Sequence, residues 1–176
     1  MQVANYMITT RRCALLSICL MALVSGCSHN GKEPKMTSHE TARASTPDTE
    51  QEHAAVQAIV AAYFSALDKA DLDGAIAAYT PDAVLTLQGL ETAKGTAQLR
   101  KVYADAFKAL RFTSTHTYDE VRVYGDEAFV RTTSGSQTTV LATGEVMQER
   151  YREFFILKKV DSQWRIDRYM NNRPSS

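Results

Sequence analysis

The sequence predicts an α+β fold, in which a curved antiparallel β-sheet shaped like a cone wraps around N-terminal helices. Two observations predict this class. Between residues 49 and 110, apolar side chains recur every three or four positions, which is the period of an amphipathic helix. From Arg111 onwards the period changes to two, and the side chains become β-branched and aromatic, as they are in strands. Helices followed by a run of long strands are typical of folds whose helices cover one face of the sheet.

Residues 1–26 have the features of a secretory signal peptide. Arg11 and Arg12 precede a run at 13–24 that is apolar apart from Ser17, and small residues follow it. A bilayer span needs roughly 17–25 apolar residues, so this run is too short to cross a membrane, whereas it fits the core of a cleaved leader. The sequence "VSGC", which ends at Cys27, resembles the bacterial lipobox, whose cysteine is lipidated and becomes the first residue of the mature chain. A plain signal peptide that contains a cysteine is the alternative.

Lipidation also explains the cysteine content, because Cys13 and Cys19 would leave with the signal peptide and Cys27 alone would remain. The domain must then be stable without a disulfide. By resemblance to lipoproteins, Ser28 favours the outer membrane, so we expect a chain anchored in the bacterial cell envelope by its lipid and facing the periplasm. Residues 27–48 are the lipidated cysteine and a polar, flexible tether that reaches on the order of 25 Å.

The domain over residues 49–176 is expected to begin with a helix that Thr49 caps and that Glu52 completes as a capping box. Asp71 is expected to cap a second, short helix, which ends at Thr80-Pro81. A strand follows at 83–88, and Thr96 is expected to cap a third helix. The first helix has an apolar face, and the residues of that face are Val56, Ile59, Val60, Tyr63 and Leu67.

Four long strands follow in the predicted meander, at 111–124, 127–141, 146–160 and 163–170, joined by glycine-, aspartate- or serine-containing turns. In the third of these strands, Phe154 and Ile156 lie on one face and Phe155 and Leu157 on the other. Apolar residues on both faces indicate that both are covered, although helices can cover only one. A second copy of the chain, and hence a homodimer through the sheet, is the expected cover; a loop or the C-terminal tail is the alternative.

Four segments carry a resemblance to the nuclear transport factor 2-like superfamily, which has a cystatin-like cone and includes ketosteroid isomerases and SnoaL-like polyketide cyclases. These segments are "YFSALDKADLDGAIAAYTPDAVL", "KGTAQLRKVYADAF", "VYGDEAFVR" and "SQWRIDRYM". The resemblance covers essentially all of residues 50–170. It implies the fold more strongly than it implies a function.

The isomerase branch uses a carboxylate base, with a tyrosine and a protonated aspartic acid that hold an oxyanion. Carried over by the resemblance, the tyrosine falls on Tyr63 and the base falls on Leu87, while the second acid has no assigned position. A leucine cannot accept a proton, and a positioned base contributes roughly 10²–10⁴ in rate. Ketosteroid-isomerase chemistry by this route is therefore not expected, and whether the chain is an enzyme stays open.

Candidate site residues follow from these assignments. Tyr63 either belongs to the core, with its hydroxyl bonded to a neighbour, or points into a cavity and contacts a ligand. His116 is a candidate substitute base if its face of the strand points inward, and Tyr118 shares that face. The side chains expected to line a pocket are Tyr63, Leu67, Leu85, Leu87 and Tyr103.

Several classes of function are disfavoured by composition and spacing. The four histidines show no metal-ligand spacing, and eight glycines form no phosphate-binding loop, so we expect no metal and no cofactor. Twenty basic and twenty acidic residues are interspersed along the chain, which argues against a nucleic-acid partner.

Three functions remain open. The first is a lipid-anchored module that binds a small, mostly apolar ligand in the cone. The second is an isomerase, cyclase or dehydratase with a non-standard base. The third is a non-enzymatic assembly subunit of the cell envelope.

Overall fold

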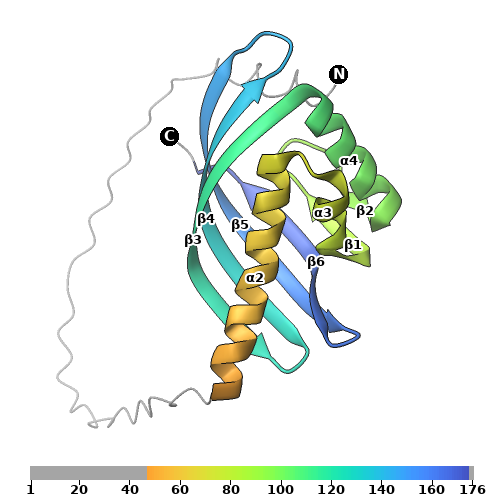
Figure 1. Cartoon of the computed structure of the whole chain (residues 1–176), viewed down its shortest axis with the longest axis vertical. Helices are drawn as coiled ribbons and strands as arrows, with labels where there is room; N and C mark the ends of the chain where they lie inside the picture. The colour runs from red at the N-terminus through yellow and green to blue at the C-terminus, as the bar shows by residue number, and fades with distance from the viewer. Residues whose placement is uncertain (1–46, 175–176) are drawn as a thin grey trace, which may run out of the picture.

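The computed structural model describes residues 47–174, so the predicted leader, Cys27 and most of the tether lie outside the described residues. Two helices, a strand and a further helix come before a run of four long strands, as predicted (Figure 1). The elements are α2 (Pro47–Lys69), α3 (Leu72–Ala77), β1 (Tyr79–Thr86), β2 (Ala93–Lys94), α4 (Gly95–Ala109), β3 (Leu110–Tyr124), β4 (Glu127–Val140), β5 (Val146–Val160) and β6 (Gln163–Asn172).

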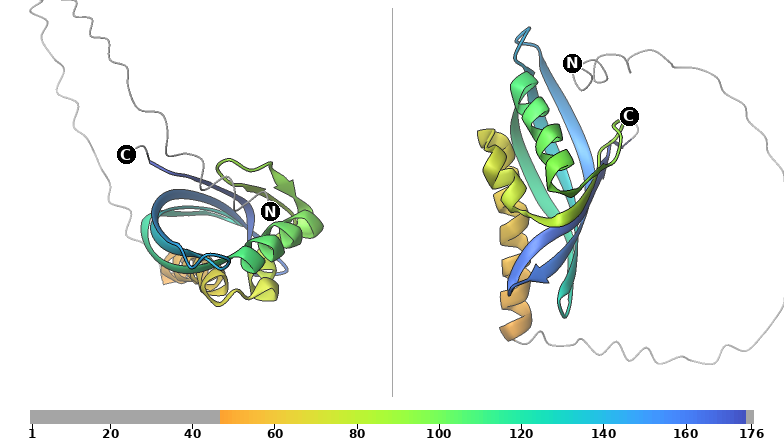
Figure 2. Two further views of the ribbon diagram at one scale, coloured as in Figure 1. Left: turned by 90° about the horizontal axis from the view of Figure 1, so that it is seen from above. Right: turned by 90° about the vertical axis from the view of Figure 1, so that its right-hand side faces the viewer.

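The strands form one curved six-stranded sheet in the order β2-β1-β6-β5-β4-β3. The α+β class is confirmed, but the sheet is mixed, because β1 pairs with β6 in parallel while the other neighbours are antiparallel. Parallel neighbours need a long connection, and α4 with β3 to β5 supplies it. Figure 2 shows the helices on the concave face of the sheet, and no helix of residues 47–174 lies on the other face.

The expected helix starts are wrong in two of three cases. α2 begins at Pro47, two residues before the expected cap, because proline is favourable at the first helical position. The carboxylate of Glu52 instead accepts hydrogen bonds from Lys159 Nζ (2.7 Å) and Trp164 Nε1 (2.6 Å), which ties the helix to the β5–β6 hairpin. α4 begins at Gly95, and Thr96 donates to a backbone carbonyl of β1.

The cap of α3 is confirmed: Asp71 Oδ1 accepts a hydrogen bond from the backbone N–H of Gly74 at 2.9 Å. The short β2 strand was not expected, and its two residues pair with β1 at the edge of the sheet.

The core lies between α2, α4 and the concave face of the sheet. Phe155 and Leu157 of β5 are fully buried there. On the opposite face, Phe154 and Ile156 are 38% and 37% exposed, so residues 47–174 cover them only in part. Phe129 of β4 packs on Phe154, with ring centroids 4.3 Å apart, and Met170 of β6 is also exposed on the sheet. We call Phe129, Phe154, Ile156 and Met170 the outer patch.

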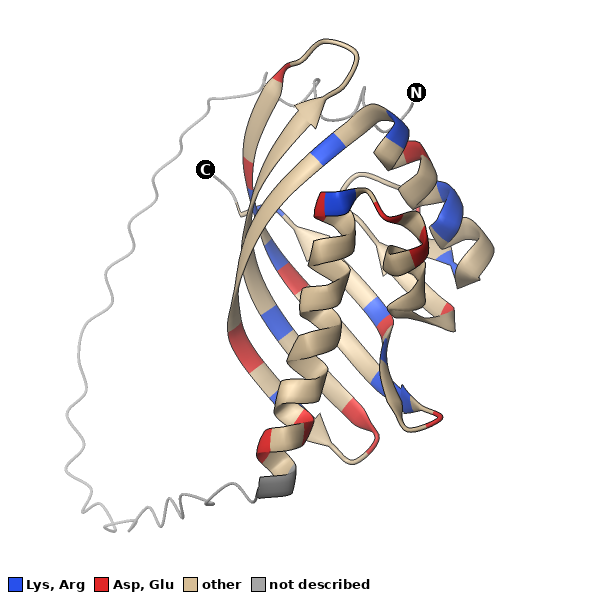
Figure 3. Ribbon diagram, in the orientation of Figure 1, with Lys and Arg blue, Asp and Glu red and all other residues tan. Residues whose placement is uncertain are grey.

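Lys and Arg are scattered among Asp and Glu over the strands and helices, and those of residues 47–174 form no basic stripe (Figure 3). No helix in the described part of the chain is long and apolar enough to cross a membrane. Residues 47–174 also contain no group of three or more His, Cys, Asp or Glu side chains placed to hold a metal ion.

Candidate functional site

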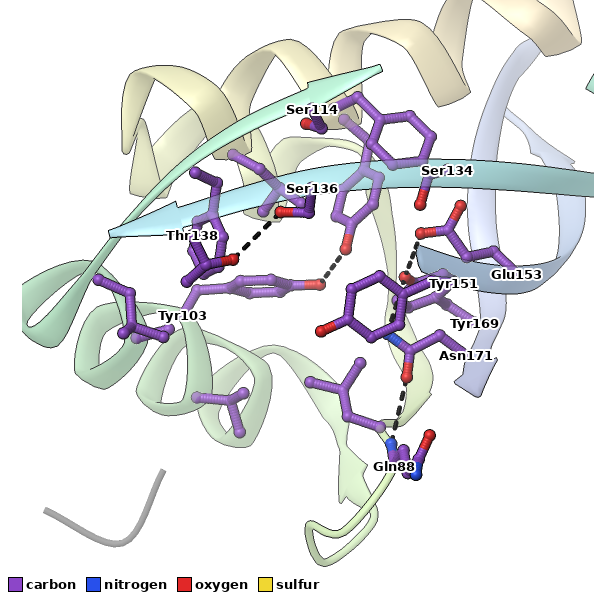
Figure 4. Close-up of a pocket in the computed structure, with 18 of the residues that line it drawn as sticks. Gln88, Tyr103, Ser114, Ser134, Ser136, Thr138, Tyr151, Glu153, Tyr169 and Asn171 are labelled. Atoms are coloured by element: carbon purple, nitrogen blue, oxygen red, sulfur yellow. Dashed lines mark hydrogen bonds between the residues drawn. The ribbon is translucent and has the colours of Figure 1, made fainter. Parts of the chain in front are cut away.

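A cavity of about 130 Å³ lies between α2, α4 and the concave face of the sheet (Figure 4). Its walls come from both halves of the described chain, since the helices contribute one side and β3 to β6 the other. The apolar part of the lining is formed by Phe64, Leu67, Leu87, Leu90, Val102, Ala106, Leu110 and Phe112. The polar part comes chiefly from β4, β5 and the end of β6.

A row of hydroxyl groups on β4 forms one wall of the cavity. Ser134, Ser136 and Thr138 alternate along the strand, which places them on the same inward face. All three side chains are buried, and Ser136 Oγ and Thr138 Oγ1 share a hydrogen bond of 3.2 Å. In the close-up, Tyr103 of α4 lies across from this pair (Figure 4).

Three tyrosine hydroxyls form a buried chain beside the cavity. The hydroxyl of Tyr103 bonds to the hydroxyls of Tyr63 (3.0 Å) and Tyr79 (2.6 Å). Burial raises the pKa of Tyr63 to about 12, and it raises the pKa of Tyr79 and Tyr103 well above the usual value. The three side chains therefore stay protonated at neutral pH and act as hydrogen-bond donors or acceptors without charge.

Glu153 of β5 is the acidic side chain at the centre of the lining. It is 4% exposed, and its two carboxyl oxygens accept hydrogen bonds from Thr132 Oγ1 (2.6 Å) and the hydroxyl of Tyr169 (3.1 Å). None of the ion pairs found in residues 47–174 involves it. Burial raises the pKa of Glu153, against the opposing effect of the neighbouring hydroxyls. A carboxyl group in such a place can both give and accept a proton.

A second polar cluster lies at the mouth of the cavity. Glu149 accepts hydrogen bonds from Arg173 (2.6 Å) and from the hydroxyl of Tyr151 (2.6 Å). Gln88 accepts from the backbone of Arg173 and donates its own backbone N–H to Asn171, at 3.1 Å. These contacts hold the end of β6 against the loop after β1, beside the cavity.

Comparison with known proteins identifies the family. The pattern of the SnoaL-like domain matches residues 60–165, which is more than half of the chain. The chain belongs to the SnoaL-like domain family. A search of curated proteins found no match.

Solved structures agree with this membership. A ketosteroid isomerase-like protein from Erwinia carotovora atroseptica SCRI1043 is 34% identical to the SnoaL-like chain, with a TM-score of 0.68 over 72% of this chain and 98% of that one. A hexachlorocyclohexane dehydrochlorinase is 14% identical, with a TM-score of 0.63 over 73% and 88%. A protein with a cystatin-like fold from Nostoc punctiforme PCC 73102 is 16% identical, with a TM-score of 0.58 over 74% and 95%. The last two show likeness of fold alone.

The pocket residues expected from the sequence do not all lie at the cavity. Tyr63, Leu67, Leu87 and Tyr103 line it. Leu85, which was expected with them, is 1% exposed in the core and is not part of the lining. The reason is its position, because Leu85 lies within β1 under the packed helices, whereas Leu87 follows the end of that strand.

The expected role of His116 as a substitute base is not supported by its position in the SnoaL-like domain. Its ring stacks on Phe64, with centroids 4.3 Å apart, and Nε2 lies 3.4 Å from the hydroxyl of Tyr118. Burial lowers the pKa of His116, with Asp68 opposing. The imidazole is not part of the cavity lining, so it packs between sheet and helix instead of facing a ligand.

Glu153 was not identified as a site residue from the sequence. In the sequence, Glu149, Arg150, Arg152 and Glu153 could either line the mouth of a pocket or form ion pairs at the sheet edge, and ion pairs are the commoner arrangement. The signal lies in the alternation of β5: once Phe155 and Leu157 are placed inward, Glu153 and Tyr151 fall on the same face. Extending the buried face by two residues would have found the carboxyl group.

Proposed function

We propose that this SnoaL-like chain is a lipoprotein, anchored in the bacterial cell envelope through Cys27, whose cavity binds a small and mostly apolar molecule. The cavity carries this proposal, because it combines apolar walls with a buried carboxyl group and a row of hydroxyls. Mostly apolar concave sites with a few placed polar groups are the usual form of small-molecule sites.

The size of the cavity limits the ligand. Pockets for drug-sized molecules measure roughly 300–1,000 Å³, whereas an apolar cavity of about 150 Å³ holds benzene. With about 130 Å³, this cavity accommodates a molecule of about one ring. A steroid of four rings does not fit without opening the walls.

Filling the cavity tests ligand binding. Ala106 lines the cavity from α4, so Ala106→Phe places a ring inside it, whereas Ala62→Phe adds the same ring on the exposed side of α2. With phenol as the probe in calorimetry, we expect binding to the full chain and to Ala62→Phe but not to Ala106→Phe. Equal binding of phenol by both variants would mean that phenol binds outside the cavity, and the cavity would then no longer support the proposed function.

The lipid anchor is tested at Cys27. The small residues before it and the polar segment after it support acylation at this position. In bacteria fed a labelled fatty acid, the wild type should carry label and sediment with membranes, and Cys27→Ser should do neither. A labelled, membrane-bound Cys27→Ser protein would contradict the anchor.

A second candidate is an enzyme of the isomerase, cyclase or dehydratase kind that uses Glu153 as its base. The observation that favours it is a buried carboxyl group with a raised pKa at the cavity, while Leu87 stands where the resemblance puts the isomerase base. Such a group can remove a proton next to a carbonyl. Exchange of the α-protons of cyclohexanone with deuterium from solvent should then be catalysed by the wild type and fall at least about 100-fold in Glu153→Gln. A wild-type rate no higher than that of buffer would exclude this candidate for cyclohexanone-like ketones.

A third candidate, an assembly subunit of the cell envelope, is supported by the outer patch. Exposed aromatic and aliphatic side chains gathered on one sheet face indicate an interaction surface. We propose that a second copy of the chain covers this patch. A monomeric full chain in light scattering would contradict the homodimer.

A further inference from the structure

We propose that Ser136 and Thr138 bind the oxygen of a neutral one-ring molecule, such as a cyclic ketone, whose single oxygen accepts a hydrogen bond. The inference rests on the proposed ligand-binding function and adds the chemical class of the ligand and the residues that recognise it. It follows from the partners of the hydroxyl groups that line the cavity, because each O–H donates one hydrogen bond.

The tyrosine hydroxyls beside the cavity have no O–H left for a ligand. They form one chain, in which Tyr79 bonds to Tyr103, Tyr103 to Tyr63, and Tyr63 to Tyr169. The chain ends where Tyr169 donates to a carboxyl oxygen of Glu153. Each O–H of the chain therefore already has an acceptor within the protein.

Three further hydroxyls of the lining bond to carboxyl groups of the protein. The acceptors are Glu153 for Ser134, Asp68 for Ser114 and Glu149 for Tyr151. These O–H groups are also in use, so they are not free to bind a ligand.

The Ser136–Thr138 pair on β4 is different, because it contains two O–H groups and makes one hydrogen bond, of 3.2 Å, between its members. Neither side chain makes another hydrogen bond within residues 47–174. Ser136 is 9% exposed and Thr138 is 1% exposed, and both line the cavity across from Tyr103 (Figure 4). A buried donor without an acceptor costs free energy, and an oxygen of a ligand would supply the acceptor.

The neighbours of the pair favour a neutral ligand. In the sheet, Ser136 lies opposite Glu149, and Thr138 lies opposite Phe112, which also lines the cavity. The guanidinium of Arg173 at the mouth is already paired with Glu149. An anionic oxygen beside Ser136 would therefore meet a carboxylate without a free cation, and a buried charge needs a partner.

The free O–H also limits the number of oxygens in the ligand. A second oxygen would lie among hydroxyls that already have acceptors, so it would lose its hydration without gaining a donor. The remainder of the ligand contacts apolar side chains such as Phe112, Val102 and Leu87, and the volume of about 130 Å³ admits one ring.

The experiment is calorimetry of the full chain with cyclohexanone and methylenecyclohexane. These two probes have the same ring and nearly the same shape, but only cyclohexanone has an oxygen. We expect both to bind the wild type. In the double variant S136A/T138V, cyclohexanone should bind at least about 5-fold more weakly, because its buried carbonyl has lost its donor. Methylenecyclohexane should bind the double variant at least as tightly as the wild type.

The double variant removes both members of the pair at nearly constant volume, so neither hydroxyl is left without its partner. Thr139→Val, on the other face of β4, is the control and should change the affinity for neither probe. Infrared spectroscopy of the wild type gives a second measurement that needs no variant. The carbonyl stretch of bound cyclohexanone should lie at lower frequency than in an apolar solvent, and an unshifted stretch would overturn the inference.

The possible failures are distinct. If S136A/T138V weakens the binding of both probes equally, or of neither, Ser136 and Thr138 do not recognise an oxygen, and this inference is overturned while the proposed function stands. The same holds if phenol binds in the cavity but cyclohexanone does not bind. If neither phenol nor either of these two probes binds the wild type, both the inference and the proposed function fail.

Discussion

Glu153 gives the cavity its chemical character, because it is the carboxyl group that the fold holds among hydroxyls without a basic partner in the described residues. Burial keeps the tyrosines around it neutral. The charge at the cavity centre therefore depends on whether the carboxyl group of Glu153 carries its proton. A site with this composition suits a neutral, oxygen-bearing ligand better than an ion, because a buried charge needs a partner.

The proton of Glu153 should be visible in the pH dependence of stability. Folding raises the pKa above the ordinary 4.5, so the folded state keeps this proton to higher pH than the unfolded state. Stability is then lost as pH rises from about 4.5 through the folded-state pKa, by about 1.4 kcal/mol for each tenfold change in acidity. Glu153→Gln lacks this loss.

Urea unfolding from about pH 4 to about pH 8 measures the effect. The free energy of unfolding of Glu153→Gln should rise relative to the wild type as pH increases. Glu145→Gln, at an exposed position in the β4–β5 turn, should show no such trend. A constant difference between Glu153→Gln and wild type would mean that folding leaves this pKa unchanged.

The tyrosine chain predicts unequal costs for two similar substitutions. Tyr63→Phe removes one hydrogen bond and leaves Tyr103 bonded to Tyr79, so we expect a loss of about 1 kcal/mol. Tyr103→Phe removes the shared partner of two buried hydroxyls and should cost at least about 2 kcal/mol. Thermal or urea unfolding compares the two. Equal losses of unfolding free energy in the two variants would show that Tyr103 is not the shared partner of the Tyr63 and Tyr79 hydroxyls.

At the scale of elements, the short helix α3 depends on the Asp71 cap and on Gly74. A Cβ at Gly74 would overlap the Asp71 carboxylate, so Gly74→Ala should displace the cap and destabilise the wild type. Asp71→Ala alone should cost about 1 kcal/mol. Once the carboxylate is gone, alanine is the better helix former by up to about 1 kcal/mol. Gly74→Ala should therefore be destabilising in the wild type and neutral or stabilising in Asp71→Ala.

The double-mutant cycle of Asp71 and Gly74, measured by urea unfolding, gives the coupling directly. If the effects of the two substitutions on the free energy of unfolding were additive, a Cβ at Gly74 would not overlap the Asp71 carboxylate.

The long strands were predictable within a few residues, because alternation over more than ten positions is a strong local signal. β5 spans Val146–Val160, as expected. Helix starts were less predictable, since Thr49 and Thr96 satisfy the sequence rule for a cap while Pro47 and Gly95 begin the helices. The parallel pairing of β1 with β6 has no local signal at all, because it joins segments some 80 positions apart.

Part of the site was predictable because helical periodicity, like strand alternation, is a strong local signal. Helical periodicity places Tyr63 and Tyr103 inward, and both line the cavity. His116 and Leu85 were predicted as site residues from their residue types and from the face of the strand on which they lie. Neither property tells where the cavity ends along a strand. Glu153 was overlooked because charged neighbours masked its inward position.

At the scale of the whole molecule, the outer patch predicts the oligomeric state. Ile156→Glu places a charge in the patch and should convert the proposed dimer to a monomer in light scattering. Leu141→Glu, at an exposed position outside the patch, is the matched control and should leave the dimer intact. Dimers in both variants would mean that another surface joins the copies.

Native mass spectrometry tests ligand binding most directly. The full chain and Ala106→Phe would be purified alike from a bacterial envelope and sprayed under gentle conditions. A small bound mass in the wild type that Ala106→Phe lacks is the predicted result, and its composition would identify the ligand class. The same mass on both proteins, or on neither, would contradict a ligand-binding cavity.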